Sequence, residues 1–261
     1  MKKSVEMNRF MKLILLWFAC LVVTLDVQAQ QYTSLSGLIQ TPSADMCPEG
    51  EARIGVHYLN KHMMPDGFQA EGSKYNSGCA YLSVTPFSWI EIGYVFTLMK
   101  GAKVDLEHPE ENGKIGYYHK DRHLSVKIRP LKEKEGKWWP SIAIGSDDPV
   151  NSKGTEATGS QYFRNYYVAA SKHLSFKGHR FGAHLAYRKW KRDVNQKWDG
   201  VVGGITYQPS FQQNLRFIVE YTGDDVNIGF DWKLWKHLLI QSSLQNGKYF
   251  SGGLCFCLNL L

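Results

Sequence analysis

From Gly50 onward, hydrophobic and polar residues alternate with a period of two, which is typical of β-strands with one apolar and one polar face. The alternation is clearest in LSVKIR at residues 124–129, where leucine, valine and isoleucine alternate with serine, lysine and arginine. The same pattern predicts about twelve strands, at residues 52–60, 77–85, 90–98, 123–131, 139–145, 162–172, 181–188, 200–207, 215–221, 226–233, 238–244 and 249–260. No segment has the period of an amphipathic helix, so the chain is predicted to be all-β.

Alternation alone fits a soluble sandwich or lipocalin-like barrel with an apolar interior as well as a membrane barrel with an apolar exterior. The composition of the two faces favours the membrane barrel. The polar face mixes charged residues with many small ones, as a crowded lumen requires; the small ones include Gly55, Gly93, Gly204 and Gly229. Aromatic residues gather near strand ends, where interfacial girdles lie; among them are Tyr58, Trp89, Trp190 and Trp235.

The connections between the predicted strands alternate in length, as external loops and periplasmic turns do. The long ones lie near residues 61–76, 99–122, 147–161 and 191–199, and the shorter ones near residues 86–89, 132–138, 174–179, 208–213 and 233–237. Two expected external connections, at residues 222–224 and 245–248, are short. We therefore predict an antiparallel transmembrane β-barrel of the outer membrane, formed by residues 50–261.

The first 29 residues have the features of an export signal. A basic start is followed by a short apolar run at residues 13–23, and Val27-Gln28-Ala29 offers the small residues that a signal peptidase recognises. The apolar run is about half the length that a spanning helix needs. We predict a cleaved signal peptide at residues 1–29, a periplasmic lead-in or lumen insert at residues 30–49, and a location in the outer membrane of a Gram-negative bacterium.

Composition and charge narrow the choice of partner. A hydrophobic content of 43% supports one sizeable core but not a bundle of membrane helices. The chain has 31 basic and 24 acidic residues, and removal of residues 1–29 leaves a net charge of about +5. No nucleic-acid motif accompanies this basic excess, and export makes a nucleic-acid partner improbable.

No established catalytic, metal or cofactor motif is present. The sequence contains neither CxxC nor HExxH nor GxSxG, and His119 and His123 would lie about 13 Å apart along an extended strand. We therefore predict no catalytic residue, no metal and no cofactor. Four cysteines follow the signal peptide: Cys47, Cys79, Cys255 and Cys257. The last two point the same way along a strand, too far apart to bridge, and the state of the first two stays open.

Charged and polar residues on one face of the predicted strands are the candidate binding residues. A lumen that handles a polar or anionic glycan would use such groups, since arginine suits carboxylates and phosphates. Alternatively, the groups pair with one another and fill a narrow barrel. The candidates are Arg53, His57, Glu91, Lys127, Arg129, His184, Arg188, Arg216 and Glu220, with Asp231 and Lys233 on the same face.

Several motifs, in order, resemble the YjbH family of outer-membrane proteins linked to exopolysaccharide production. GLIQTPSA at residues 37–44 and PEGE at residues 48–51 resemble the start of the family's sequence. The remaining motifs are PFSWIE, LSVKIR, PSIAIG and YVAASK, at residues 86–91, 124–129, 140–145 and 167–172. Beyond residue 172 the resemblance is one of pattern only.

The resemblance implies an outer-membrane barrel that helps to secrete, organise or modify a capsule-like polysaccharide. The implied partners are that polysaccharide, outer-membrane lipid and other proteins of the exopolysaccharide system. We expect a non-enzymatic accessory protein; a general porin and an outer-membrane glycan or lipid hydrolase are the alternatives.

Overall fold

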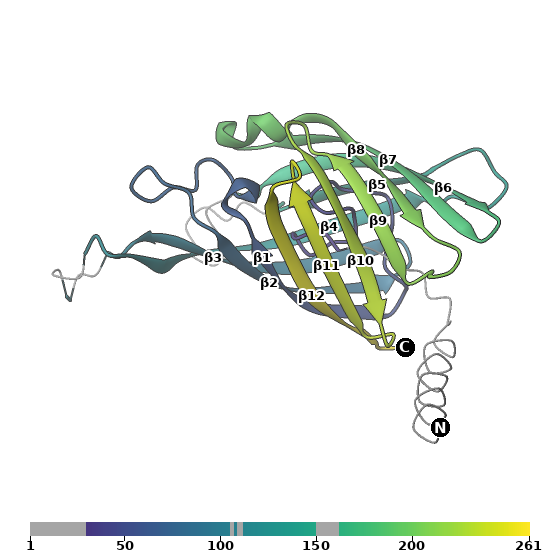
Figure 1. The fold of residues 1–261 in the computed structure, drawn as a ribbon, viewed down its shortest axis with the longest axis horizontal. Helices are drawn as coiled ribbons and strands as arrows, with labels where there is room; N and C mark the ends of the chain where they lie inside the picture. Colours follow the sequence, from purple (N-terminus) through teal and green to yellow (C-terminus); the bar gives the residue numbers. More distant parts are fainter. Residues whose placement is uncertain (1–29, 105–106, 109–111, 150–161) are drawn as a thin grey trace, which may run out of the picture.

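The computed structural model describes residues 30–104, 107–108, 112–149 and 162–261, and the predicted signal peptide lies outside them. The twelve predicted strands are confirmed, and they close into one antiparallel barrel in which each strand pairs with its neighbours in sequence and β1 pairs with β12 (Figure 1). The strands are β1 (Glu51–Leu59), β2 (Ser77–Phe87), β3 (Ile90–Ala102), β4 (Ile115–Leu131), β5 (Ser141–Asp147), β6 (Asn165–Phe176), β7 (His179–Trp190), β8 (Gly200–Gln208), β9 (Leu215–Tyr221), β10 (Val226–Leu234), β11 (Leu238–Gln245) and β12 (Tyr249–Asn259).

The described ranges contain short 3-10 helices, η1 (Lys61–Met63) and η3 (Asp193–Trp198), in two of the long connections. None of the helices in these ranges is long and apolar enough to cross a membrane.

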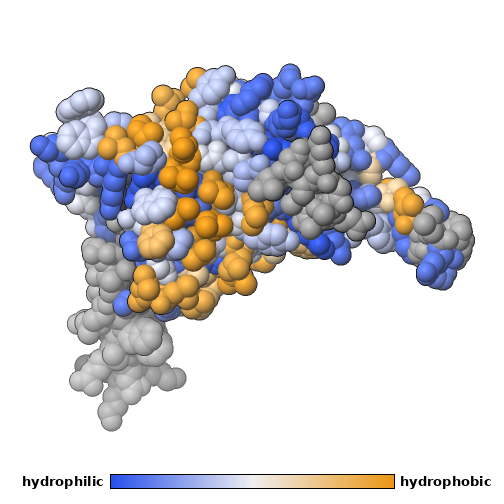
Figure 2. Space-filling view, turned by 180° about the vertical axis from the view of Figure 1, so that it is seen from behind, coloured by the Kyte–Doolittle hydropathy of each residue, from blue (hydrophilic) through white to orange (hydrophobic). Residues whose placement is uncertain are grey.

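The apolar side chains of the strands point outward and the charged ones point inward, which is the arrangement of a membrane barrel and the reverse of a soluble one. In β1, Ile54 and Val56 are 57% and 55% exposed, whereas Arg53 is 2% exposed. On the surface, hydrophobic residues gather in a band with hydrophilic regions on either side of it (Figure 2). The predicted outward side chains follow the same rule, since Leu185 and Phe217 are exposed.

Strands β3 and β4 are longer than predicted. β4 has 17 residues and begins at Ile115, within a stretch that the sequence indicates is a loop. A tilted transmembrane strand needs only about 9–11 residues, so the β3–β4 hairpin projects well past the barrel (Figure 1). Its outer part has polar residues on both faces, as in HKDR at residues 119–122. This is why the alternation did not reveal it.

The prediction that Trp190 belongs to an interfacial girdle is wrong. The residue is 2% exposed and packs inside the barrel against Trp198, at 5.5 Å between ring centroids. It shares the inward face of β7 with His184 and Arg188, so a strict period of two places it inside. Tyr58, Trp89 and Trp235 are exposed, as girdle residues are.

Replacing an outward residue by a cation is expected to impair assembly. Phe217→Arg places a charge on the apolar face, at a cost of about 2–4 kcal/mol near the membrane midplane. We expect a smaller fraction of heat-modifiable, folded barrel in the membrane. Phe211→Arg is the matched control because Phe211 is 80% exposed in the β8–β9 turn. Equal yields of the two variants would contradict an apolar exterior in contact with lipid.

Candidate functional site

Residues 30–47 pass through the inside of the barrel, and all of them are buried (Figure 1). We call this segment the insert. It forms no regular strand, and its only pairings are the isolated bridges Gln30↔Ser36 and Gly37↔Pro42. Because a buried backbone must find hydrogen-bond partners, the polar groups that do not bond within the insert depend largely on the side chains of the barrel wall.

One carboxylate on β9 binds the central turn of the insert. Glu220 accepts hydrogen bonds from the backbone N–H groups of Ile39, Gln40 and Thr41, at 2.9, 2.8 and 3.0 Å. Asn227 on β10, paired with Glu220 across the ladder, donates to the same carboxylate at 2.6 Å. Successive N–H groups that converge in this way form an anion-binding nest, and here the anion is a side chain of the wall.

Two arginines bind the carbonyl groups of the same turn. Arg188 Nη1 donates to the carbonyl of Gln40 at 2.9 Å, and Arg216 Nη2 donates to that of Gly37 at 3.2 Å. Arg216 also pairs with Asp231, its partner across β9 and β10, at 2.9 Å. Both guanidinium groups therefore connect the insert to the wall. That of Arg216 also balances the negative charge of the buried Asp231.

A lysine and a glutamate bind the insert from the opposite wall. Lys127 on β4 and Glu91 on β3 pair at 2.8 Å, and both side chains are fully buried. Glu91 accepts from the backbone N–H and the hydroxyl of Ser36, at 3.1 and 2.7 Å. Lys127 donates to the carbonyls of Ser36 and Asp45, at 2.7 and 2.6 Å. Hydrogen bonds from and to the insert offset part of the cost of burying this ion pair.

The start of the insert is bound near the β1–β12 seam. Arg53 donates to the side-chain carbonyl of Gln30 at 2.7 Å and pairs with Glu51 at 2.6 Å, and Lys233 lies 3.2 Å from Glu51. His57 instead bonds to Gln241 of the wall at 2.9 Å.

Small residues in the wall make room for the insert. A Cβ atom on Gly93 would lie 1.9 Å from the hydroxyl oxygen of Ser34, and one on Gly204 would lie 2.7 Å from a methyl carbon of Leu38. At Gly204 the backbone carbonyl of Val219 would be closer still, at 2.4 Å, so the wall also excludes a side chain there. Of the small residues named from the sequence, Gly93, Gly204 and Gly229 thus face the insert, whereas Gly55 faces Tyr81 of the wall.

Loops cover the lumen at the end with the long connections. Met63 and Met64, in the long connection near residues 61–76, are 1% exposed and belong to the interior apolar cluster with Trp198. Asp66 joins the β1–β2 and β7–β8 loops, since it accepts from Lys74 at 2.7 Å and from Lys197 at 2.9 Å. Burial favours a raised pKa for Asp66, but the hydrogen bonds from these two lysines outweigh it and lower the pKa.

The end with the short turns carries a polar cavity of about 260 Å³. Arg129 lines it; this residue is half-buried and donates to the carbonyl of Ser88 at 2.7 Å, so it lies at the rim and not among the residues that hold the insert. Glu133 lines it too, and accepts from the backbone and the ring of His173. Burial favours a raised pKa for Glu133, but the hydrogen bonds from His173 outweigh it and lower the pKa.

Most candidate residues from the sequence are thus brought together around one segment. Arg53, Glu91, Lys127, Arg188, Arg216 and Glu220 contact the insert directly, while His57 and Arg129 do not. His184 lies 3.8 Å from Asp45 of the insert. The sequence did not single out Ser36, Asp45 and His173, although the GLIQTPSA motif, which is the bound turn itself, pointed to the segment. All four cysteines that follow residue 29 are buried free thiols.

The chain has limited similarity to solved structures. One match is the outer membrane phospholipase A from Escherichia coli, with 11% identity, 80% of this chain and 95% of that chain covered, and a TM-score of 0.34. Another is the Salmonella typhi outer membrane phospholipase dimer with bound calcium, with 12% identity, 80% and 89% covered, and a TM-score of 0.33. No curated protein matches the chain. At these values the likeness contributes nothing to the assignment of function.

The fold and its interior define a closed twelve-stranded β-barrel with an apolar exterior, whose lumen is occupied by its own N-terminal segment. The chain belongs to the YjbH family, described as "Exopolysaccharide biosynthesis protein YbjH", whose family profile matches residues 29–261. The resemblance that the motifs indicated is confirmed, and it extends through the second half of the barrel.

Glu220→Gln is expected to loosen the insert. The amide keeps the shape but loses the charge that binds three backbone N–H groups, so we expect a loss of about 2–4 kcal/mol in the free energy of unfolding. Denaturant titration of the refolded barrel, followed by tryptophan fluorescence, measures it. Glu135→Gln, in the exposed β4–β5 turn, is the control. Unchanged stability of Glu220→Gln would mean that the nest does not hold the insert.

Proposed function

We propose that this protein is an outer-membrane, non-enzymatic accessory of exopolysaccharide production, acting in export or surface attachment of the polymer. The family match supports the pathway. The apolar exterior and the polar interior support a position in a lipid bilayer. A cleaved signal peptide at residues 1–29 would bring the chain there.

The observation that carries the proposal is the occupied lumen. Six wall side chains spread over β1, β3, β4, β7 and β9 bind the insert, so the lumen offers no free path to a solute while the insert is bound. This argues against a general diffusion pore. In this proposal the charged wall residues hold the insert, and the polysaccharide contacts the outer surface.

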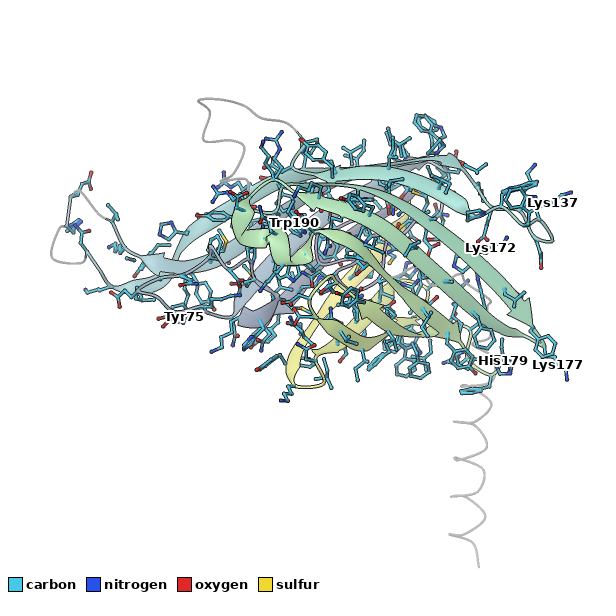
Figure 3. The ribbon with its side chains drawn as sticks, turned by 90° about the horizontal axis from the view of Figure 1, so that it is seen from above. Tyr75, Lys137, Lys172, Lys177, His179 and Trp190 are labelled. Carbon is cyan, nitrogen blue, oxygen red and sulfur yellow. The ribbon has the colours of Figure 1, made fainter. Side chains whose placement is uncertain are left out.

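The projecting β3–β4 hairpin offers a surface of suitable chemistry. The ammonium group of Lys100 lies 5.3 Å from the ring centroid of Tyr75 and 5.2 Å from that of Tyr117. Tyr117 is 51% exposed. Figure 3 places Tyr75 at one end of the molecule and Lys137, Lys177 and His179 at the other, so this group lies at the end we assign to the cell exterior. Aromatic faces and a cation suit sugar rings that carry carboxylates.

Deletion of the gene is expected to lower surface or secreted polysaccharide and leave small-solute uptake normal. The reverse pattern would favour the porin alternative. Complementation with Tyr117→Ala should restore less polymer than complementation with Tyr118→Ala, because Tyr118 is similarly exposed but lies on the opposite face of the hairpin. Equal restoration would remove the hairpin surface from the proposal, and detection of released sugar or fatty acid would favour the hydrolase alternative.

Displacing the insert is expected to open the barrel. Gly93→Leu places a side chain where Ser34 lies, so we expect ion conductance in planar bilayers to rise from near zero. Gly78→Leu is the matched control because Gly78 lies on the outer face of β2, where an added Cβ atom would meet nothing closer than 3.8 Å. Large conductance in the wild-type protein would contradict the occupied lumen.

A further inference from the structure

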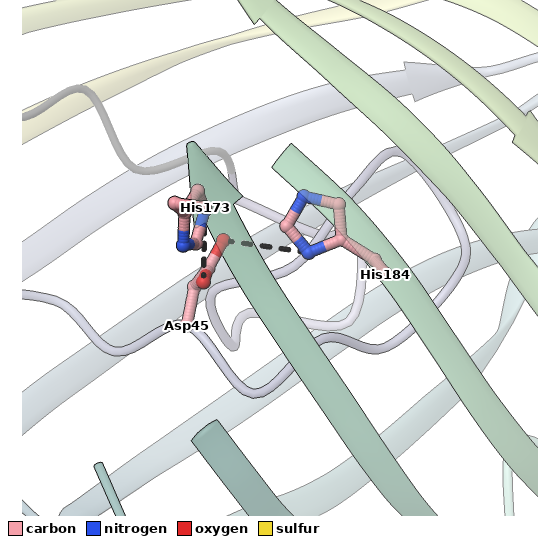
Figure 4. Close-up of side chains that lie close together, drawn as sticks. All are labelled: Asp45, His173 and His184. Carbon is pink, nitrogen blue, oxygen red and sulfur yellow. Dashed lines mark ion pairs between the residues drawn. The ribbon is translucent and has the colours of Figure 1, made fainter. Parts of the chain in front are cut away.

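An aspartate of the insert lies between two histidines of the wall, near the end with the short turns (Figure 4). The Nε2 atom of His173, on β6, is 3.5 Å from Asp45 Oδ1, and the Nδ1 atom of His184, on β7, is 3.8 Å from Asp45 Oδ2. One donor atom from each residue lies within 4.8 Å of the other two. Two imidazoles and a carboxylate from three separate segments thus converge on one point.

Asp45 has an unmet hydrogen-bonding position at this point. The residue is 5% exposed, and its Oδ2 atom accepts no hydrogen bond from the described residues. The neighbouring cation is Arg216, whose Nη1 atom is 3.8 Å away and whose guanidinium is engaged by Asp231 and by the carbonyl of Gly37. A buried carboxylate oxygen without a donor is costly, and a bound cation would remove the cost.

Both histidines are held by partners on their other ring nitrogens, as metal-binding histidines are. Glu133 accepts from Nδ1 of His173, which leaves the Nε2 lone pair directed toward Asp45. In the tautomer of His184 that carries the ring proton on Nε2, the Nε2–H group donates to Thr206 Oγ1 at 3.1 Å. The Nδ1 atom then has a free lone pair and is the ligand atom. The hydroxyl of Ser171 lies 2.9 Å from Nδ1 and accepts from the N–H of Ala44, so it must move aside and give up the bond to Ala44 before an ion can reach Nδ1.

We propose that Asp45, His173 and His184 form a zinc site that ties the insert to β6 and β7. Zinc ligands lie about 2.1 Å from the ion, so two of them are roughly 3.4 Å apart in a tetrahedral site. The separations of 3.5 Å from His173 Nε2 to Asp45 Oδ1 and 3.8 Å from His184 Nδ1 to Asp45 Oδ2 are close to this value. The three ligand atoms, one from each residue, lie within 4.8 Å of one another and must draw closer together around an ion. Two imidazoles select a transition metal over calcium or magnesium. The polar cavity of about 260 Å³, lined by Asp45 and His173, provides entry and room for water as a fourth ligand.

The test is metal binding by the refolded, metal-free barrel in detergent. Equilibrium dialysis against Zn²⁺ should give one ion per chain, and Co²⁺ should give the visible absorption bands of a site with nitrogen ligands. Glu133→Gln removes only the partner of a ligand and should weaken Zn²⁺ binding roughly ten- to hundredfold. Asp45→Asn and His173→Gln each remove a ligand and should weaken it by at least as much. His119→Gln, at an exposed histidine of the β3–β4 hairpin, should bind as the wild type does.

Absence of stoichiometric zinc in the wild-type barrel would overturn the proposal, and so would unchanged affinity in Asp45→Asn. An equal loss in His119→Gln would assign the binding to the surface. Zinc X-ray absorption of the wild-type protein adds a measurement that needs no variant: two imidazole ligands support the site, and oxygen ligands alone overturn it. None of these outcomes depends on the proposed role in exopolysaccharide production.

Discussion

The interior of this barrel depends on one constraint: an irregular segment enclosed by a closed sheet must find in the wall every hydrogen-bond partner that it does not contain itself. Some backbone bonds lie within the insert, such as those from Gln31 N–H to the carbonyl of Leu35 and from Leu38 N–H to that of Thr41. The strand backbones provide few of the others, such as the carbonyl of Tyr221 that accepts from Thr41 Oγ1, because most of their N–H and C=O groups are used in the closed ladder. Side chains must therefore provide the rest, and the insert needs both acceptors and donors. Glu220 provides the acceptor for three N–H groups, while Arg188, Arg216 and Lys127 donate to carbonyls. The mixed charge of the lumen follows directly from this need.

The same constraint explains why the charges occur as cross-strand pairs. Glu91 lies opposite Lys127 in the ladder, and Arg216 lies opposite Asp231. A lone buried charge is costly, whereas each of these pairs shares its charge across the ladder and also bonds to the insert, through Ser36 and Gly37. The sequence left two interpretations of the lumen open: that it binds a polar ligand, or that it is filled by its own charged groups. The structure combines features of both. The wall does bind a polar chain, and that chain is its own N-terminal segment.

The fold was predictable because apolar and polar side chains alternate wherever one face of a strand contacts lipid and the other faces the lumen. The prediction failed where both faces of a strand are solvent-exposed, as in residues 115–120 of β4. It also failed where an aromatic residue was assigned by its type and not by its position in the alternation, as with Trp190. The inward charges were predictable for the same reason. Their partners were not, because the insert has no periodicity and its contacts join residues far apart in sequence, such as Gln40 and Glu220. Asp45, His173 and His184 likewise converge only through the pairing of β6 with β7 around the insert.

The strength of these contacts bears on what the barrel can do. Each hydrogen bond to a charged group contributes about 1.5–3 kcal/mol, and a folded domain has only about 5–15 kcal/mol of net stability. Releasing the turn at residues 37–41 would break such bonds to Glu220, Arg188 and Arg216 together. It would also leave buried charges without partners. The release therefore costs a large share of the total stability, and the insert behaves as part of the core, not as a gate that opens in each transport cycle. This agrees with the proposal that a partner contacts the exposed ends of the barrel, where the projecting hairpin and the polar cavity lie.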